Sequence, residues 1–208
     1  MPASRHRPGK IVCVGRNYRE HAKELGNEVP KEPLLFLKPP SSVVWEGEPI
    51  VLRRESSKVE HEGEIGVVIG KTLSWVPEDE AAKGIRAIVA VNDVTARDLQ
   101  KSDGQWTRAK GFDTFCPLGE ESSKLPDLDN LTVVTRVNGV ERQRGKSSEM
   151  VFSIPSLLAY ISRIMTLEPG DLVATGTPSG VGPLVSGDVV EVEIEGISRV
   201  TNPVQESR

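Results

Sequence analysis

Three acidic residues in this chain have the type and spacing needed to bind a divalent metal ion. Glu62 and Glu64 are two positions apart in the run 58–70, which alternates polar and apolar residues before becoming apolar. Side chains of a strand alternate between faces, so these two carboxylates point the same way. Asp93 ends a second apolar run, 87–92. Three carboxylates suit a hard cation such as Mg²⁺ or Mn²⁺, and octahedral geometry leaves three positions open for substrate.

Each of these acids also has an ordinary interpretation. Glu62 and Glu64 are typical of a charged edge strand that deters aggregation, and Asp93 is typical of a turn after a strand, helped by Asn92. The apolar residues that follow Glu64 favour the metal hypothesis. They predict an internal strand, where carboxylates without a positive partner are costly.

A possible acid–base pair lies near the N-terminus. His21 and Glu24 are three residues apart, and therefore share one face of a short helix predicted to start after an Asn17 cap, with Glu20 completing a capping box. Gly26 and Asn27 are predicted to end that helix. The pair is either an ordinary surface contact or a Glu-oriented imidazole that acts as general base toward water.

Other polar segments are less informative. The glycine-rich stretch 175–182 is either a plain connection or a loop whose donors hold a carboxylate. Lys110, taken alone, is typical of a surface lysine. His61 faces away from Glu62 and Glu64 by the two-residue period, so we do not expect it to bind the metal. Gly70-Lys71-Thr72 resembles the end of a P-loop, but it lacks the upstream glycine and the helix that motif requires.

Composition indicates a soluble globular protein. The 208 residues are 37% hydrophobic and 27% charged, with a net charge of -4 and no basic cluster for nucleic acid or anionic membrane. Cys13 and Cys116 lack metal-binding spacing and are expected to be buried thiols in a reducing compartment. We expect no membrane span, a cytoplasmic location, a flexible segment over residues 1–10 and a single catalytic domain over 11–208.

Short β-branched runs dominate the pattern, and they predict a mostly β fold with few helices (α+β). Asn138-Gly139 is a hairpin signature. Helices are predicted over 77–84 and from Ser153 to Pro169. The second has an apolar stripe that we expect to be buried, formed by Leu157, Leu158, Ile161, Ile164 and Met165. Strands are predicted over 11–14, 65–69, 87–91, 131–137, 171–175 and 188–194.

Taken together, the motifs resemble the fumarylacetoacetate hydrolase family, in particular its short acylpyruvase and oxaloacetate decarboxylase-like members. They occur in family order and cover the chain from about residue 11 to its end. The matching stretches are Val14-Gly-Arg-Asn-Tyr18, His21-x-x-Glu24, Pro33-Leu-Leu-Phe-Leu-Lys-Pro39, His61-Glu-Gly-Glu-Ile-Gly-Val-Val68, Asn92-Asp-Val-Thr-Ala-Arg-Asp98, Lys110-Gly-Phe-Asp113, Phe152-Ser-Ile-Pro155 and Thr175-Gly-Thr-Pro178.

The resemblance implies curled, mixed β-sheets in a sandwich or roll around a metal site, usually in a homodimer. It implies that Mg²⁺ or Mn²⁺ binds the acidic trio, and that His21 and Glu24 form a catalytic dyad on a mobile lid. Glu60 occupies a position where some relatives carry a second histidine. The resemblance adds Lys110 to the catalytic residues and implies a substrate pocket lined by Arg16, Tyr18, Gln100 and Thr177.

The expected chemistry begins with a 2-oxo acid whose carboxylate and keto oxygens chelate the metal, which stabilises an enolate. Two outcomes are expected: decarboxylation, as for oxaloacetate, or hydrolytic C–C cleavage of an acylpyruvate-type substrate with His21 activating water. One alternative is a 2-hydroxyhepta-2,4-diene-1,7-dioate isomerase or a 5-oxopent-3-ene-1,2,5-tricarboxylate decarboxylase of aromatic catabolism. Another is a non-catalytic β-domain that binds a metal or ligand.

Overall fold

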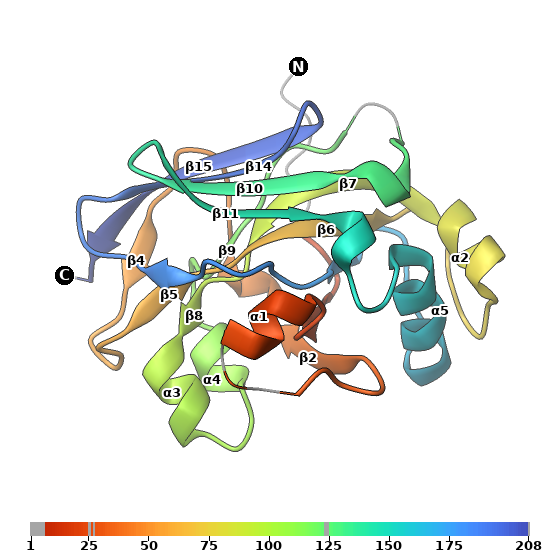
Figure 1. The fold of residues 1–208 in the computed structure, drawn as a ribbon, viewed down its shortest axis with the longest axis horizontal. Helices are drawn as coiled ribbons and strands as arrows, with labels where there is room; N and C mark the ends of the chain where they lie inside the picture. Colours follow the sequence, from red (N-terminus) through yellow and green to blue (C-terminus); the bar gives the residue numbers. More distant parts are fainter. Residues whose placement is uncertain (1–6, 25, 27, 123–124, 208) are drawn as a thin grey trace.

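Two five-stranded sheets pack face to face in this computed structural model, which describes residues 7–24, 26, 28–122 and 125–207 (Figure 1). The first sheet has the order β2 (Leu34–Lys38), β1 (Ile11–Gly15), β12 (Leu172–Ala174), β6 (Gly63–Ile69), β7 (Ile85–Asn92). The second has the order β11 (Val140–Lys146), β10 (Thr132–Val137), β14 (Val189–Ile194), β15 (Ser198–Glu206), β4 (Ile50–Leu52). This confirms the mostly β fold with few helices.

Two smaller sheets complete the β structure. One joins β13 (Gly182–Pro183), β5 (Val59–His61) and β8 (Thr95–Ala96), and the other pairs β3 (Val43–Val44) with β9 (Cys116–Pro117). Short 3₁₀ turns cover Pro40–Ser42, Leu128–Asn130 and Ser147–Glu149. The predicted hairpin at Asn138-Gly139 joins β10 to β11, and both turn residues have positive φ, 53° and 76°.

The largest buried hydrophobic cluster among the described residues lies between the two large sheets. Ile65 and Val67 of β6, Val133 of β10 and Val192 of β14 belong to one buried cluster. Every residue of β6 is buried, and the strand lies between β12 and β7. The apolar run after Glu64 is therefore an internal strand, as its composition predicts.

Two helices pack together at one end of the sandwich, α2 (Glu78–Lys83) and α5 (Ile154–Ile164) (Figure 1). Ser153 caps α5 by accepting a hydrogen bond from the Ser156 N–H. The predicted apolar stripe is buried at positions 157, 158 and 161. The prediction is wrong at Ile164, which is 55% exposed because the helix ends there, at the margin of the core.

The helix α1 (Arg19–Glu24) begins differently from the prediction. Asn17 is fully buried, and its amide donates to the carbonyls of Phe152 and Thr175 and accepts from the Phe152 N–H. Its side chain therefore ties the start of α1 to two distant segments. The predicted capping role is wrong, because tertiary partners take both ends of the amide. Asn27 lies outside the described residues.

The flexible segment predicted over residues 1–10 stays a prediction, since residues 1–6 lie outside the described part of the chain. The backbone N–H and the ammonium group of Lys10 both donate to the Asp171 carboxylate. Cys13 and Cys116 are buried free thiols, as expected. Among the described residues, no helix is long and apolar enough to cross a bilayer.

Candidate metal and catalytic site

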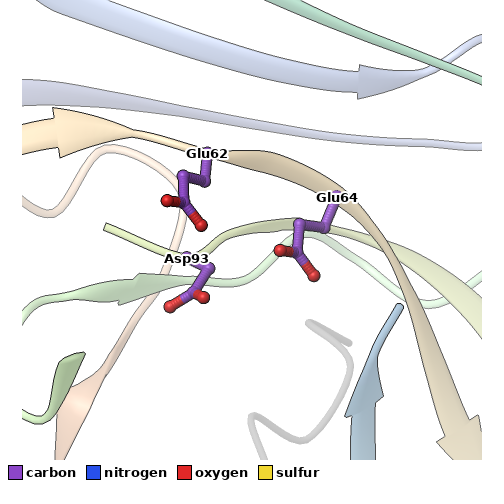
Figure 2. Close-up of side chains that lie close together, drawn as sticks. All are labelled: Glu62, Glu64 and Asp93. Carbon is purple, nitrogen blue, oxygen red and sulfur yellow. The ribbon is translucent and has the colours of Figure 1, made fainter. Parts of the chain in front are cut away.

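The acidic trio converges at one point of the structure. Glu62 precedes β6 and Glu64 lies within it, and both carboxylates point into the space that Asp93 enters from the end of β7 (Figure 2). In the antiparallel pairing, Gly63 is opposite Asn92, and the Asp93 N–H donates to the Glu62 carbonyl at 2.8 Å. One oxygen from each of the three buried carboxylates lies within 4.8 Å of the others.

Three buried cations surround the trio. The Lys110 ammonium lies 2.8 Å from Glu62 Oε2 and 2.6 Å from Asp93 Oδ2. The Lys38 ammonium lies 2.7 Å from Asp93 Oδ1. Arg97 donates to Glu62 through one terminal nitrogen. Burial opposes ionisation of Glu62, but Lys110 and Arg97 outweigh it and hold the pKa of that carboxyl well below its usual range.

Glu64 differs from its two neighbours. Its Oε2 accepts the Gly176 N–H at 2.8 Å, and none of the ion pairs among the described residues includes it. Burial, followed by the negative charges of Asp93 and Glu62, raises the pKa of Glu64 well above its ordinary value. A buried carboxylate without a cationic partner, next to two others, fits a site for a divalent cation.

The predicted acid–base pair is also assembled. His21 Nδ1 lies 3.2 Å from Glu24 Oε2, and the imidazole is 4% exposed. The Gly180 N–H donates to both oxygens of Glu24, at 3.0 and 3.2 Å. The loop 175–182 thus contacts the trio through Gly176 and the pair through Gly180. The sequence left open whether this loop is a plain connection or holds a carboxylate. In the structure, two of its N–H groups donate to the carboxylates of Glu64 and Glu24.

The trio and the pair line the same cavity, which has a volume of about 440 Å³. Most of its lining residues are polar or charged, and two aromatic rings in edge-to-face contact, Phe36 and Trp106, also line it. The remaining lining residues are Val14, Gly15, Arg16, His21, Glu24, Glu62, Glu64, Asp93, Arg97, Gln100, Lys101, Lys110 and Thr177.

Three of the four residues predicted to contact substrate lie on this wall. Arg16 has a left-handed backbone, with φ of 59°. Gln100 accepts from Arg97, and Thr177 donates its hydroxyl to the Gly63 carbonyl. Tyr18 lies instead in the hydrophobic core, where its buried hydroxyl has no partner among the described residues.

Lys38 and Arg97 also belong to the site, although neither was among the site residues predicted from the sequence. Lys38 ends an apolar run in the segment 33–39, a pattern that places a charge at the edge of a core. Arg97 pairs with Glu60 as well as Glu62, so Glu60 contributes to the charge balance without joining the trio. As the strand period predicts, His61 faces away from the trio, toward Gln143.

This arrangement combines the elements required for metal-assisted proton transfer. A cation can be held by carboxylates, a lysine ammonium lies beside them, and an imidazole oriented by a carboxylate faces the same space. Such a set stabilises negative charge on a bound oxygen while a neighbouring atom gains or loses a proton.

Known proteins are similar to this chain in sequence and in fold. The profile of the fumarylacetoacetate hydrolase C-terminal family matches residues 10–205. The chain is 47% identical to an Arabidopsis thaliana protein named oxaloacetate tautomerase FAHD1, mitochondrial, and the match covers 94% of this chain and 91% of that one. It is 46% identical to a protein of Dictyostelium discoideum named oxaloacetate decarboxylase, mitochondrial, and the match covers 90% of this chain and 89% of that one. A crystal structure of 5-carboxymethyl-2-hydroxymuconate delta-isomerase from Mycobacterium smegmatis superimposes with a TM-score of 0.90 at 44% identity, covering 97% of this chain and 80% of that one.

Proposed function

The chain belongs to the fumarylacetoacetate hydrolase family, and on that basis we propose a divalent-metal-dependent enzyme that enolises small 2-oxo acids. The observation that carries the proposal is the convergence of the acidic trio, Lys110 and the His21–Glu24 pair on one cavity. Oxaloacetate is the substrate we favour, because relatives 46–47% identical over most of the chain are named for its decarboxylation and tautomerisation.

Glu62, Glu64 and Asp93 would hold the cation, with Mg²⁺ or Mn²⁺ as the candidates that suit three carboxylates. When bound, the cation supplies a Lewis acid for the carboxylate and keto oxygens of the 2-oxo acid. The buried charges of Lys38, Lys110 and Arg97 offset those of the trio and of Glu60. They keep the site from repelling an anionic substrate.

The protein side chains then determine where the proton goes. In tautomerisation, the C3–H bond breaks, its electron pair forms the C2–C3 double bond, and the π pair of the C2 carbonyl moves to the keto oxygen, which gains a proton. His21 would take the proton from C3 and return it to the oxygen, with Glu24 orienting the ring through Nδ1. In decarboxylation of oxaloacetate, the C3–C4 bond breaks and CO₂ leaves. The electron pair of the broken bond forms the same C2–C3 double bond while the carbonyl π pair moves to the keto oxygen, and no base is needed.

Hydrolytic C–C cleavage is a second candidate, favoured by the same pair. In an acylpyruvate, His21 would take a proton from water as its oxygen attacks the distal carbonyl carbon. The bond between that carbon and C3 then breaks, which releases a carboxylic acid and pyruvate enol. Isomerisation of a hydroxymuconate-type acid is a third candidate, because the solved structure that superimposes at a TM-score of 0.90 is named as 5-carboxymethyl-2-hydroxymuconate delta-isomerase.

A turnover panel tests these proposals. The purified protein, stripped with EDTA, is mixed with oxaloacetate, acetylpyruvate or a hydroxymuconate-type diacid, with and without Mg²⁺ or Mn²⁺. We expect metal-dependent consumption of oxaloacetate enol or release of pyruvate. We expect this activity to be absent in Glu64→Gln. The matched control is Glu121→Gln, at a carboxylate that pairs with Arg86 on the surface. Cation binding without turnover of any substrate would instead support the non-catalytic binding domain.

A further inference from the structure

One buried side chain outside the cavity joins the two halves of the site. Gln143 lies on β11, in the second sheet, and is 1% exposed. Its Oε1 accepts from the Gly63 N–H at 3.0 Å and lies 3.1 Å from His61 Nδ1. Its Nε2 donates to Thr177 Oγ1 at 2.7 Å and to the Pro178 carbonyl at 2.8 Å. All four hydrogen-bonding positions of the carboxamide are therefore used.

The orientation of this carboxamide follows from its backbone partners. The Gly63 N–H can only donate, so Oε1 must face it, and the Pro178 carbonyl can only accept, so Nε2 must face that side. The Thr177 hydroxyl, which accepts from Nε2, donates to the Gly63 carbonyl at 2.9 Å. Gln143, Gly63 and Thr177 thus form a closed ring of hydrogen bonds that holds both polar groups of one peptide residue.

Gly63 is the residue between Glu62 and Glu64, so this ring fixes the backbone from which both carboxylates extend. A Cβ at Gly63 would lie 1.9 Å from Thr135 Oγ1, so the second sheet presses directly on this backbone. Thr135 is the residue opposite Gln143 in the pairing of β10 with β11. Only glycine fits there, and the contact leaves the segment little room to shift.

The same carboxamide holds the loop that reaches the acid–base pair. Pro178 and Thr177 lie between Gly176, which donates to Glu64, and Gly180, which donates to Glu24. Gly180 has φ of +97°, and a Cβ there would lie 2.1 Å from the carbonyl of Arg142, the neighbour of Gln143 on β11. β11 therefore supports the loop at two successive residues.

We propose that Gln143 is a positioning residue that keeps the cation-binding carboxylates and the His21–Glu24 pair in one mutual arrangement. The proposal rests on the proposed function for its link to catalysis. Its structural content stands on the ring around Gly63 and on the support of loop 175–182. Outer-shell hydrogen bonds of this kind typically change metal affinity or activity by about 10–100-fold when removed.

Gln143→Met tests the proposal, because it keeps the volume and removes all four hydrogen bonds. We expect the Kd for Mn²⁺, measured by calorimetry, to rise about 10–100-fold, and kcat for oxaloacetate to fall. We also expect faster hydrogen exchange at the Gly176 and Gly180 amides in the metal-free protein. Asn202→Leu is the matched control: it too removes a buried carboxamide, one that donates to the carbonyls of Trp45 and Glu48.

Both variants should lower Tm, but only Gln143→Met should change Mn²⁺ affinity and exchange in the loop. If Gln143→Met binds Mn²⁺ within two-fold of wild type, with unchanged exchange at Gly176 and Gly180, the proposal is overturned. Thr177→Val removes two of the three hydrogen bonds of the ring, those with Gln143 Nε2 and with the Gly63 carbonyl. It serves if Gln143→Met does not fold, and the same two readouts then decide. A wild-type protein that binds no Mn²⁺ would refute the proposed function, and exchange alone would then decide the role of Gln143.

Discussion

Lys38 is the buried cation whose removal gives the sharpest test of the charge balance at the site. Its side chain is 0% exposed, and its ammonium donates to Asp93 Oδ1 at 2.7 Å and to the Val94 carbonyl at 3.2 Å. Lys38→Met keeps most of the volume and removes the charge. In the metal-free protein, Lys110, at 2.6 Å, is then the one cationic partner that Asp93 retains among the described residues.

The expected loss of stability is large for a single substitution. Removing one partner of a buried ion pair costs about 3–5 kcal/mol, because the other charge stays in a medium of low polarity. Lys110 still neutralises part of Asp93, so we expect the lower end, about 3 kcal/mol. For a chain of this size, 1 kcal/mol lowers Tm by about 2–4 °C, which predicts a decrease of about 6–12 °C.

The measurement is a thermal melt in EDTA and in Mn²⁺. Mn²⁺ should raise the Tm of Lys38→Met by more than that of wild type, because removing a positive charge beside Asp93 strengthens cation binding and ligand binding stabilises the folded state. Lys83→Met is the control, since its partner Glu80 and its own side chain are both more than half exposed, at 52% and 63%. A Tm for Lys38→Met in EDTA within about 2 °C of wild type would refute the reasoning, since 1 kcal/mol alone shifts Tm by that much.

Three further predictions test separate parts of the structure. His21→Gln should slow hydrolysis of an acylpyruvate by about 10²–10⁴-fold. It should slow decarboxylation of oxaloacetate far less, because loss of CO₂ needs no base. Equal decreases in the two steady-state rates would contradict the role of His21 as general base toward water. Burial raises the pKa of Cys116 to about 12 and that of Cys13 well above its ordinary value. Neither thiol should therefore react with a coloured disulfide reagent at pH 8 until the chain is unfolded in guanidinium. A rapid rise in the absorbance of the released thiolate with the native protein would contradict this. Burial opposes ionisation of Asp98, but hydroxyl and N–H donors of two nearby serines outweigh it and lower the pKa from 3.8 to about 2. This carboxylate therefore stabilises the fold above about pH 4, and that contribution is lost as the pH falls toward 2. Asp98→Asn should lower Tm at pH 7 and flatten the dependence of Tm on pH between 4 and 2. If the variant shows a dependence as steep as that of wild type, Asp98 does not make this contribution to stability.

The local pattern of the sequence was sufficient to place two of the three acidic residues, Glu62 and Glu64, on one face of a strand. The two-residue period of a strand places Glu62 and Glu64 on one side and His61 on the other, and the structure has them so. The apolar run that follows them marks β6 as internal. Asp93 was weaker on its own, because a single acid after a strand fits a turn equally well. The pairing of β6 with β7 resolves that ambiguity, because Gly63 lies opposite Asn92 and the Asp93 N–H donates to the Glu62 carbonyl.

Contacts between residues far apart in the chain could not be predicted from local sequence patterns. Asn17 has the composition of a helix cap, yet Phe152 and Thr175 take its amide. Tyr18 belongs to a motif predicted to contact substrate, but it packs into the core.

The sequence by itself determined which carboxylates share a face and which segments are strands, since these depend on periods of two residues and on local composition. Only the tertiary structure decided which charges balance them, because Lys38, Arg97 and Lys110 reach the trio from three separate elements. It also decided that Gln143, on the opposite sheet, would close a hydrogen-bonded ring around Gly63. A hydrogen bond or ion pair depends on distances between atoms, and distances between remote segments are set by how the two sheets pack.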